Sequence, residues 1–252
     1  MNLRVELYHN LRHSLQILFG TRFNELVWRF RHIYKRDWAE ESIRSFSHPH
    51  RQLLVRKILS NKPLTRVLEI GCASGPNLYM LARRSPNVHC VGIDINPEAI
   101  RQGTEFFRKQ NINNVSLHVG KADDLERFPD ESFDVVFTDA VLMYVCPDKI
   151  KKVATEIMRV SRKAIILAEH CSIDANALGT YQEKWWLRDY LKLFQSFGLR
   201  ANVAKIPPEI WGGNWGRFGY IIEIKKPSAE TAKTIEETPI YVDLGEQVPI
   251  PA

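Results

Sequence analysis

Two carboxylates on either side of a turn of small residues could bind a polar, positively charged ligand. Glu69 lies near the end of an apolar segment, residues 65–70, and the turn 71–75 follows it. Asp94 ends the next apolar segment, 25 residues after Glu69. Small residues let a ligand approach the backbone of such a turn, and an acid about 20 residues further on can bind ribose hydroxyls. The spacing therefore indicates a ligand that contains a nucleoside.

The turn differs from the one that binds nicotinamide or flavin dinucleotides. The dinucleotide turn has the pattern Gly-x-Gly-x-x-Gly and places a pyrophosphate at the N-terminus of the next helix. Here Ala73 takes the second position and Pro76 the third. The carboxylate of Glu69 would also repel a pyrophosphate, whereas it suits a cofactor with sulfonium and ammonium groups. The remaining alternative is a strand-to-helix turn that binds no ligand.

Buried strands and capped helices must position these side chains. Short hydrophobic runs that end in turns predict strands, and helical spacing with capping residues predicts helices. Asn96 is expected to cap a helix whose first residue is Pro97. The expected strands are 65–70, 88–94, 115–119, 132–139, 164–169, 201–206 and 220–224, and the expected helices are 76–84, 97–110, 147–160 and 182–197.

Four motifs in this order, between residues 65 and 145, resemble those of class I (Rossmann-like) S-adenosylmethionine-dependent methyltransferases. The usual first motif of that family is an apolar strand followed by acid-x-Gly-x-Gly-x-Gly, from which Ala73 is a mild departure. The resemblance implies an α/β fold with a seven-stranded, mostly parallel, doubly wound sheet in the order 3-2-1-4-5-7-6. The last strand is antiparallel, helices cover both faces, and this chain adds an N-terminal helical extension. The resemblance also implies S-adenosyl-L-methionine as the cofactor.

The resemblance further implies which residues hold the cofactor. The family usually has an acid after the glycine that follows the third strand, where this chain has Lys121. Asp123 is therefore expected to contact the adenine instead. The residues expected to bind the cofactor are Glu69, Gly71, Cys72, Ala73, Gly75, Asp94, Ile95, Ala122, Asp123 and Asp139.

Methyl transfer depends mainly on orienting the acceptor and excluding water. A hydroxyl acceptor also needs a general base. His170, which follows the fifth strand, is the candidate for that base, and the alternative is a loop imidazole hydrogen-bonded to the backbone. Tyr144 is a second candidate catalytic residue. The expected substrate and lid residues are Tyr34, Trp38, Met143 and Trp185.

Several features of the sequence limit the expected classes of acceptor and the expected cellular location. Residues 138–141 are Thr-Asp-Ala-Val rather than the Asp/Asn-Pro-Pro-Tyr of enzymes that methylate exocyclic amines of bases, so DNA is not an expected partner. His48 and His50 flank a proline without a third ligand in sight, so no metal site is expected. The four cysteines are widely spread, and no apolar run approaches the roughly 20 residues of a membrane span. We therefore expect a reducing, cytoplasmic location.

The chain is expected to comprise a basic helical extension or lid (1–50), a cofactor-binding domain (51–226) and an extended tail (227–252). Residues 1–60 hold 11 lysines and arginines and 5 acids, so the whole net charge of +6 lies there. Their basic side chains suit either a packing extension or attraction of an acidic partner, such as an anionic substrate or membrane surface. Two amphipathic helices are expected, one with Leu3, Leu7, Leu11, Leu15 and Leu18 on its apolar face, and one capped by Thr21 with Phe23, Leu26, Val27, Phe30, Ile33 and Tyr34.

The sequence thus predicts a methyltransferase that acts on an oxygen or nitrogen of a small or medium-sized acceptor, with anionic acceptors among the candidates. The alternative is a cofactor-binding domain with low turnover that docks to a membrane surface or a partner through its basic N-terminal helices. A methyltransferase that acts on RNA or protein is a minor alternative.

Overall fold

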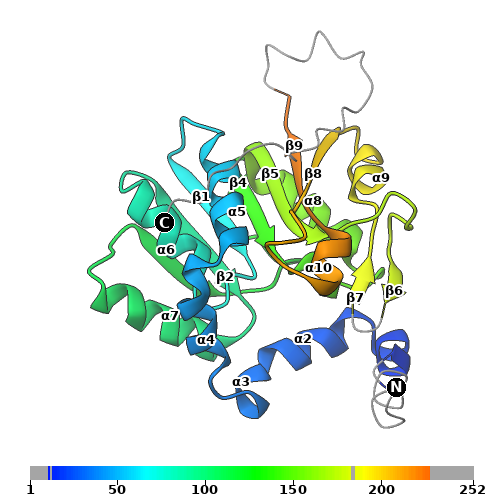
Figure 1. The fold of residues 1–252 in the computed structure, drawn as a ribbon, viewed down its shortest axis with the longest axis horizontal. Helices are drawn as coiled ribbons and strands as arrows, with labels where there is room; N and C mark the ends of the chain where they lie inside the picture. Colours follow the sequence, from blue (N-terminus) through cyan, green and yellow to red (C-terminus); the bar gives the residue numbers. More distant parts are fainter. Residues whose placement is uncertain (1–10, 12, 183–184, 228–252) are drawn as a thin grey trace.

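A seven-stranded sheet runs through the centre of the molecule and carries helices on both faces (Figure 1). The computed structural model describes residues 11, 13–182 and 185–227. The strands of this sheet are β1 (Arg66–Ile70), β2 (His89–Asp94), β3 (Val115–Val119), β4 (Phe133–Asp139), β5 (Ser161–His170), β8 (Ala201–Lys205) and β9 (Gly219–Lys225). Their spatial order, β3-β2-β1-β4-β5-β9-β8, confirms the predicted order, and β9 is antiparallel to both of its neighbours.

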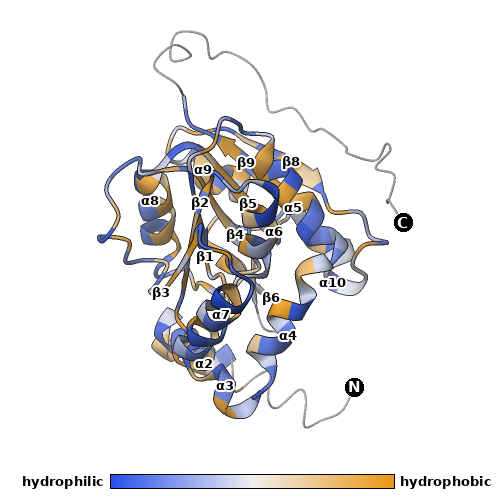
Figure 2. Cartoon of the chain, turned by 90° about the vertical axis from the view of Figure 1, so that its left-hand side faces the viewer, coloured by the Kyte–Doolittle hydropathy of each residue, from blue (hydrophilic) through white to orange (hydrophobic). Residues whose placement is uncertain are grey.

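Two hydrophobic clusters hold the sheet between its helical layers. One cluster joins helices α5 (Pro49–Leu59), α6 (Pro76–Arg84) and α7 (Pro97–Lys109) to the face that carries Val67 and Val135. The other joins α8 (Ile150–Val160) and α9 (Tyr190–Gln195) to the face that carries Leu68 and Val136. Successive side chains of a strand point to opposite faces, so a strand that is apolar at every position has both faces covered. Figure 2 shows these strands as a mainly hydrophobic layer inside the helices.

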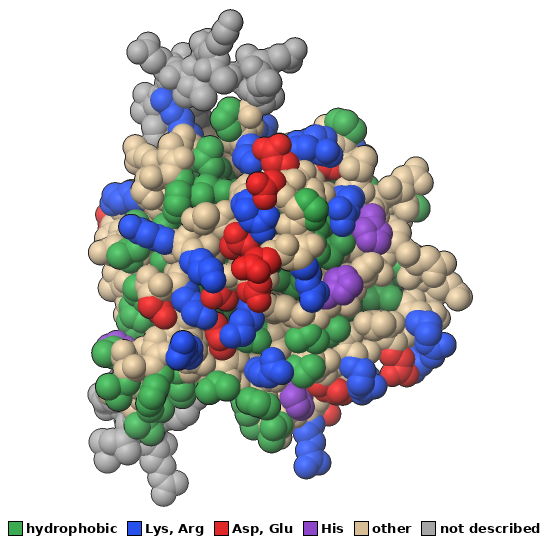
Figure 3. Space-filling view, turned by 180° about the vertical axis from the view of Figure 1, so that it is seen from behind, with side chains coloured by type: hydrophobic (Ala, Val, Ile, Leu, Met, Phe, Trp, Pro, Cys, Tyr) green, Lys and Arg blue, Asp and Glu red, His purple; other side chains and the backbone are tan. Residues whose placement is uncertain are grey.

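The N-terminal helices begin along the bottom edge of Figure 1, and the last of them runs upward beside α7. They are α2 (Thr21–Arg29), α3 (Arg31–Tyr34) and α4 (Trp38–Arg44), and the 3-10 turn η1 (Ser45–Ser47) connects them to α5. Seen from behind, this edge carries exposed hydrophobic side chains (Figure 3). The expected positions Leu3 and Leu7 and the expected tail from residue 228 onward lie outside the described residues. Within the described part of the chain, no helix has the length and apolar character needed to span a membrane.

The predicted helix over residues 182–197 is wrong. The first part of this segment belongs to a hairpin of β6 (Thr180–Gln182) and β7 (Trp185–Leu187), and only the later part forms a helix, the short α9. The side chain of Arg188 is fully buried and donates to the backbone carbonyls of Leu142, Val145 and Leu178. Asp189 then caps α9 by accepting from the backbone N–H of Lys192. The long-range hydrogen bonds of Arg188 end the hairpin, and the local cap at Asp189 starts a new helix, so helical spacing alone does not reveal this boundary.

Capping decides where two of the other helices begin. The side chain of Asn96 accepts from the N–H groups of Glu98 and Ala99, which confirms the predicted cap of α7. The predicted cap of α2 is wrong, because Thr21 is the first residue of that helix rather than its cap. Both the N–H and the hydroxyl of Thr21 donate to the carboxylate of Asp148, which thus binds the N-terminus of α2 from across the chain. The helix α10 (Gly213–Phe218) and the 3-10 turn η2 (Leu142–Tyr144) complete the fold.

Candidate active site

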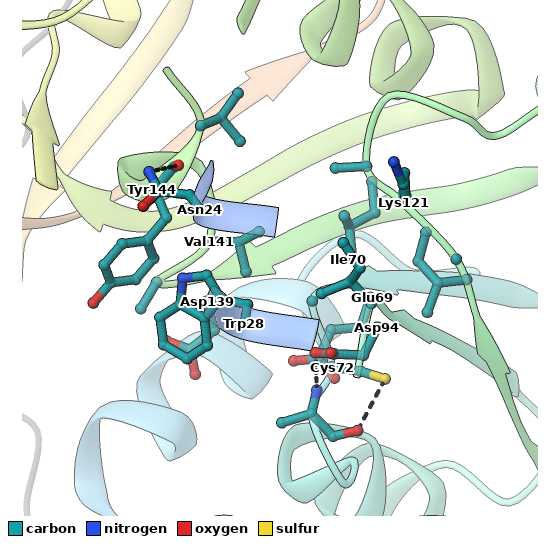
Figure 4. Close-up of a pocket in the computed structure, with 18 of the residues that line it drawn as sticks. Asn24, Trp28, Glu69, Ile70, Cys72, Asp94, Lys121, Asp139, Val141 and Tyr144 are labelled. Atoms are coloured by element: carbon teal, nitrogen blue, oxygen red, sulfur yellow. Dashed lines mark hydrogen bonds between the residues drawn. The ribbon is translucent and has the colours of Figure 1, made fainter. Parts of the chain in front are cut away.

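A cavity of about 260 Å³ lies at the carboxyl ends of β1, β2 and β4, next to α2 (Figure 4). In sheets of this type, ligands bind outside the carboxyl ends of the strands where the strand order reverses, and β1 and β4 are the neighbours at that point. Gly75, in a left-handed conformation, precedes α6 and does not line the cavity. The other nine residues predicted to bind the cofactor do line it: Glu69, Gly71, Cys72, Ala73, Asp94, Ile95, Ala122, Asp123 and Asp139.

Asp94 fixes the turn after β1 to the end of β2. One of its carboxylate oxygens accepts from the N–H of Ala73 and the other from the N–H of Asn96, each at 2.8 Å. Burial raises the pKa of Asp94, and these N–H donors act in the opposite direction. Gly71 and Ala73 both have positive φ angles, of 72° and 50°. Asp94 therefore shapes the turn, and its contact with a ribose stays a prediction.

Glu69 and Asp139 face the cavity from adjacent strands and share a hydrogen-bond donor. The amide of Asn77 donates to Oε1 of Glu69 at 2.7 Å and to Oδ2 of Asp139 at 3.0 Å. Nη1 of Arg51 and Nε2 of His50 also lie 2.8 and 3.1 Å from that Asp139 oxygen. Burial alone would raise the pKa of Asp139, but His50 and Arg51 outweigh burial and hold the pKa below its usual value. Burial dominates at Glu69 and raises its pKa to about 8.

One acceptor and one donor in this cluster have no hydrogen-bond partner among the residues that the structure describes. They are Oε2 of Glu69 and Nε of Arg51, and both side chains line the cavity. Buried polar atoms are nearly always paired in folded proteins. The two atoms therefore fit a ligand that carries both a cationic and an anionic group, such as the ammonium and carboxylate of an amino acid.

Lysines surround the opposite end of the cavity, where the adenine contact was predicted. Lys121 lies 2.7 Å from the carboxylate of Glu25, which belongs to α2. Lys149 bridges Glu25 and Asp123, at 2.5 and 3.0 Å. The lysine that replaces the usual family acid thus pairs with the N-terminal extension. Asp123 lines the cavity, and its contact with adenine stays a prediction.

Helix α2 covers the cavity with side chains that the sequence analysis did not select. Asn24 donates to the backbone carbonyl of Tyr144 at 2.8 Å. The ring of Trp28 lies 4.7 Å from that of Tyr144 and 6.0 Å from that of Trp38, and all three rings line the cavity. Tyr144, predicted as a catalytic residue, and Trp38, predicted as a substrate or lid residue, thus both line the cavity, and their roles stay predictions. The signal for Asn24 and Trp28 was their spacing of four residues, which places them on one face of a helix.

Tyr34 does not face the cavity, so its predicted inward orientation is wrong. The side chain is 61% exposed, and its hydroxyl donates to the backbone carbonyl of Val27. The reason is that the other side of this segment faces the main domain. The side chains of Thr21, Asn24 and Glu25 form hydrogen bonds with groups of the main domain, and Trp28 lines the cavity. The apolar residues of this segment consequently point away from the cavity.

His170, Met143 and Trp185 do not line the cavity. His170 is buried with its ring 5.2 Å from Trp185 and 4.4 Å from Trp215, and neither ring nitrogen has a hydrogen-bond partner among the described residues. Burial lowers its pKa to about 4. The N–H of Met143 donates to the carboxylate of Glu169, whose burial raises its pKa to about 7. The role of His170 as a general base stays a prediction, and the geometry does not bring it to the cavity.

His50 and His48 form a short chain that leads away from Asp139. Their Nδ1 atoms lie 2.9 Å apart, and the ring of His50 lies 4.3 Å from that of Trp211, which lines the cavity. His48 also caps α5 by accepting from the N–H of His50. These histidines therefore start a helix and support Asp139. Arg51 and Asn77, which complete the cluster, carried no signal in the sequence, because only the fold brings them to β1 and β4.

Comparison with known proteins gives a consistent result. A model of the methyltransferase domain family matches residues 61–205, which is more than half of the chain. Cycloartenol-C-24-methyltransferase from Arabidopsis thaliana is 32% identical over 119 residues, 47% of this chain and 34% of that protein. Magnesium-protoporphyrin O-methyltransferase from Rhodobacter capsulatus is 28% identical over 150 residues, 59% of this chain and 62% of that protein. The chain thus spans less than two thirds of the length of either relative.

The fold is also shared with solved structures. The structure of geranyl diphosphate methyltransferase in complex with S-adenosylmethionine superposes with a TM-score of 0.57. It is 16% identical in sequence, and the match covers 70% of this chain and 83% of that one. At this level of identity, the likeness shows a common architecture of sheet and helices.

Proposed function

Because the chain belongs to the methyltransferase domain family, we propose that it transfers a methyl group from S-adenosylmethionine to a small or medium-sized acceptor. S-adenosylmethionine is the cofactor of this family. One observation carries the proposal: Oε2 of Glu69 and Nε of Arg51 have no hydrogen-bond partner among the described residues. Both side chains line a cavity that nine of the ten predicted cofactor-binding residues also line.

The residues that line the cavity suit each part of this cofactor. Glu69 would hold the ammonium and Arg51 the carboxylate of its amino acid portion, because a buried charge needs a partner of opposite sign. Asp94 would bind the ribose hydroxyls. Ala122 and Asp123 would lie beside the adenine. When bound, the cofactor supplies an electrophilic methyl group, and the chain holds the acceptor in line with it and excludes water.

The acceptor would lie between the cofactor and the aromatic rings of Trp28, Trp38 and Tyr144. Because the cavity must hold both the cofactor and the acceptor, it favours a small acceptor or one end of a larger one. Pockets for small molecules are typically lined by apolar and aromatic groups. Two relatives are named for cycloartenol and magnesium-protoporphyrin, and a third for tRNA. We propose that the acceptor is an organic metabolite that carries a hydroxyl or amine.

All four cysteines are free and buried, which supports the expected cytoplasmic location.

A product assay tests this function. The full chain is incubated with S-adenosylmethionine that carries an isotopically labelled methyl group and with a library of hydroxyl and amine acceptors. Mass spectrometry is expected to find a labelled, methylated product and S-adenosylhomocysteine in equal amounts. Tight cofactor binding without any product across the library would instead favour a cofactor-binding domain with low turnover.

Cofactor binding is expected to release about one proton near pH 7. In the free chain, the pKa of about 8 keeps the carboxyl of Glu69 mostly protonated at this pH, and Glu69 would ionise beside the cofactor ammonium. The released proton is measured by titration calorimetry in two buffers with different ionisation enthalpies. In Glu69→Gln, the difference between the buffers should disappear. A wild-type binding enthalpy that is independent of the buffer would contradict this role of Glu69.

The raised pKa of Glu69 also determines how the free energy of unfolding changes with pH. Because the pKa of Glu69 is about 8 in the folded chain and 4.5 for an unperturbed glutamate, the folded state binds more protons between these values. Its contribution to the free energy of unfolding therefore falls as the pH rises from about 4.5 to about 8. Glu69→Gln should remove this part of the pH dependence.

A further inference from the structure

Helix α2 buries two polar side chains and exposes a large apolar one. Thr21 and Asn24 are buried, whereas Leu26 is 55% exposed, and Phe30, directly after the helix, is 45% exposed. A surface helix of a globular protein normally has the opposite arrangement. The inward side chains are explained by the cavity and by the partners described above. The outward apolar side chains are not explained by any contact that the active site requires.

Exposed apolar side chains are concentrated in this one segment. Among the described residues, ten large hydrophobic side chains are exposed, and eight of them lie between residues 11 and 34. Figure 3 shows hydrophobic side chains along the lower edge, where Figure 1 places α2 and α3. An apolar patch of this kind marks an interaction site. We call it the outward face and define it by Ile17, Leu18, Phe19, Leu26, Phe30 and Ile33.

The exposed charges beside the outward face are mostly positive, and among residues 13–37 the exposed acid is Asp37. Arg22, Arg29 and Arg36 are exposed. The single acid of α2, Glu25, turns inward and pairs with Lys121 and Lys149. The segment therefore presents apolar side chains together with an excess of cations, and the acid of α2 is directed into the cavity. This combination is complementary to a surface that is both apolar and anionic.

We propose that the outward face binds the surface of an anionic lipid bilayer. A helix with apolar side chains and arginines on its exposed side can lie in the interface, with its apolar groups among the acyl chains and its cations at the headgroups. A second copy of the chain is a poorer occupant, because two such faces would bring their arginines together. Since the opposite side of α2 covers the cavity, the active site would lie directly beneath the lipid surface.

Vesicle co-sedimentation with the full chain tests the proposal. The chain is expected to bind phosphatidylcholine vesicles that contain phosphatidylglycerol, to bind pure phosphatidylcholine vesicles much more weakly, and to dissociate as salt is added. Arg22→Gln combined with Arg29→Gln should weaken binding about 30-fold, since each cation near such a surface contributes about 1 kcal/mol. Arg84→Gln combined with Arg108→Gln removes two exposed arginines elsewhere and should leave binding unchanged.

A second pair of variants tests the apolar contribution. Leu26→Ser combined with Ile33→Ser should weaken vesicle binding about tenfold or more, because two side chains lose their apolar burial. Val119→Ser combined with Ile173→Ser alters the two large hydrophobic residues that are exposed elsewhere in the described part of the chain, and this pair should have no effect. All four positions in these pairs are exposed, and circular dichroism verifies that each variant is folded.

Three outcomes would overturn the proposal. The first is that the full chain does not bind phosphatidylglycerol vesicles. The second is that the segment variants and their controls bind equally well. The third is a dimer in size-exclusion chromatography that Leu26→Ser with Ile33→Ser dissociates, which would assign the outward face to self-association. Vesicle binding requires neither cofactor nor acceptor, so its failure would leave the proposed methyl transfer untouched.

Discussion

Replacing Gly71 with alanine is expected to weaken cofactor binding by more than about 100-fold, which corresponds to roughly 2.7 kcal/mol. Gly71 has a φ of 72°, where an L side chain costs about 1–2 kcal/mol. A Cβ at this position would also lie 2.3 Å from Cγ2 of Val141. The turn would have to move away from Val141, and it would shift within the cavity that its residues line. Titration calorimetry with S-adenosylmethionine measures the change.

Gly198 provides the matched control for backbone strain. Its φ is 76°, and a Cβ there would meet nothing within 4 Å. Gly198→Ala should therefore lower the melting temperature slightly and leave cofactor affinity unchanged. Val141→Ala introduced into Gly71→Ala should recover part of the affinity, because both γ carbons that approach the new Cβ are removed. Wild-type affinity in Gly71→Ala would show that the turn does not contact the cofactor.

Deleting residues 1–30 is expected to weaken cofactor binding by about 30- to 100-fold while shifting the melting temperature by only a few degrees. The deletion removes Trp28 and Asn24 from the cavity wall, and lost apolar and hydrogen-bonded contacts of this kind amount to about 2–3 kcal/mol. It exposes little of the main core, because neither hydrophobic core cluster includes a residue of α2. Calorimetry and thermal unfolding of the same preparation give the two values.

Two variants separate the two sides of α2. Trp28→Ala changes the inward side and should reproduce much of the loss of affinity. Leu26→Ser changes the outward side and should bind the cofactor like the wild type. Unchanged affinity in the truncated chain would mean that α2 does not cover the bound cofactor. A collapse of the melting temperature would mean that its main role is structural.

The sequence was sufficient to predict the sheet and most of the residues that meet at the cavity. Strand β1 carries the apolar residues Val67, Leu68 and Ile70, and a turn of small residues follows it, so local pattern and local structure agree. The acids at the ends of β1, β2 and β4 meet at one edge because parallel strands place their carboxyl ends together. Their position therefore follows from the strand order alone.

The errors arose where distant contacts override local pattern. The apolar spacing from Phe23 to Tyr34 predicted a buried face, but hydrogen bonds from Thr21 to Asp148 and from Asn24 to Tyr144 turn the polar side inward. The hairpin of β6 and β7 depends in the same way on the buried Arg188. Neither set of partners lies close in sequence, so helical periodicity could not reveal them.

The most direct test of the central claim is titration calorimetry of the full chain with S-adenosylmethionine, S-adenosylhomocysteine and NAD. The unpaired atoms of Glu69 and Arg51 and the carboxylate of Asp94 predict saturable binding of the first two ligands. Ala73 and Pro76, which replace two glycines of the dinucleotide pattern, predict no measurable binding of NAD. Saturable binding of NAD without a signal for S-adenosylmethionine would contradict the assignment of this cavity.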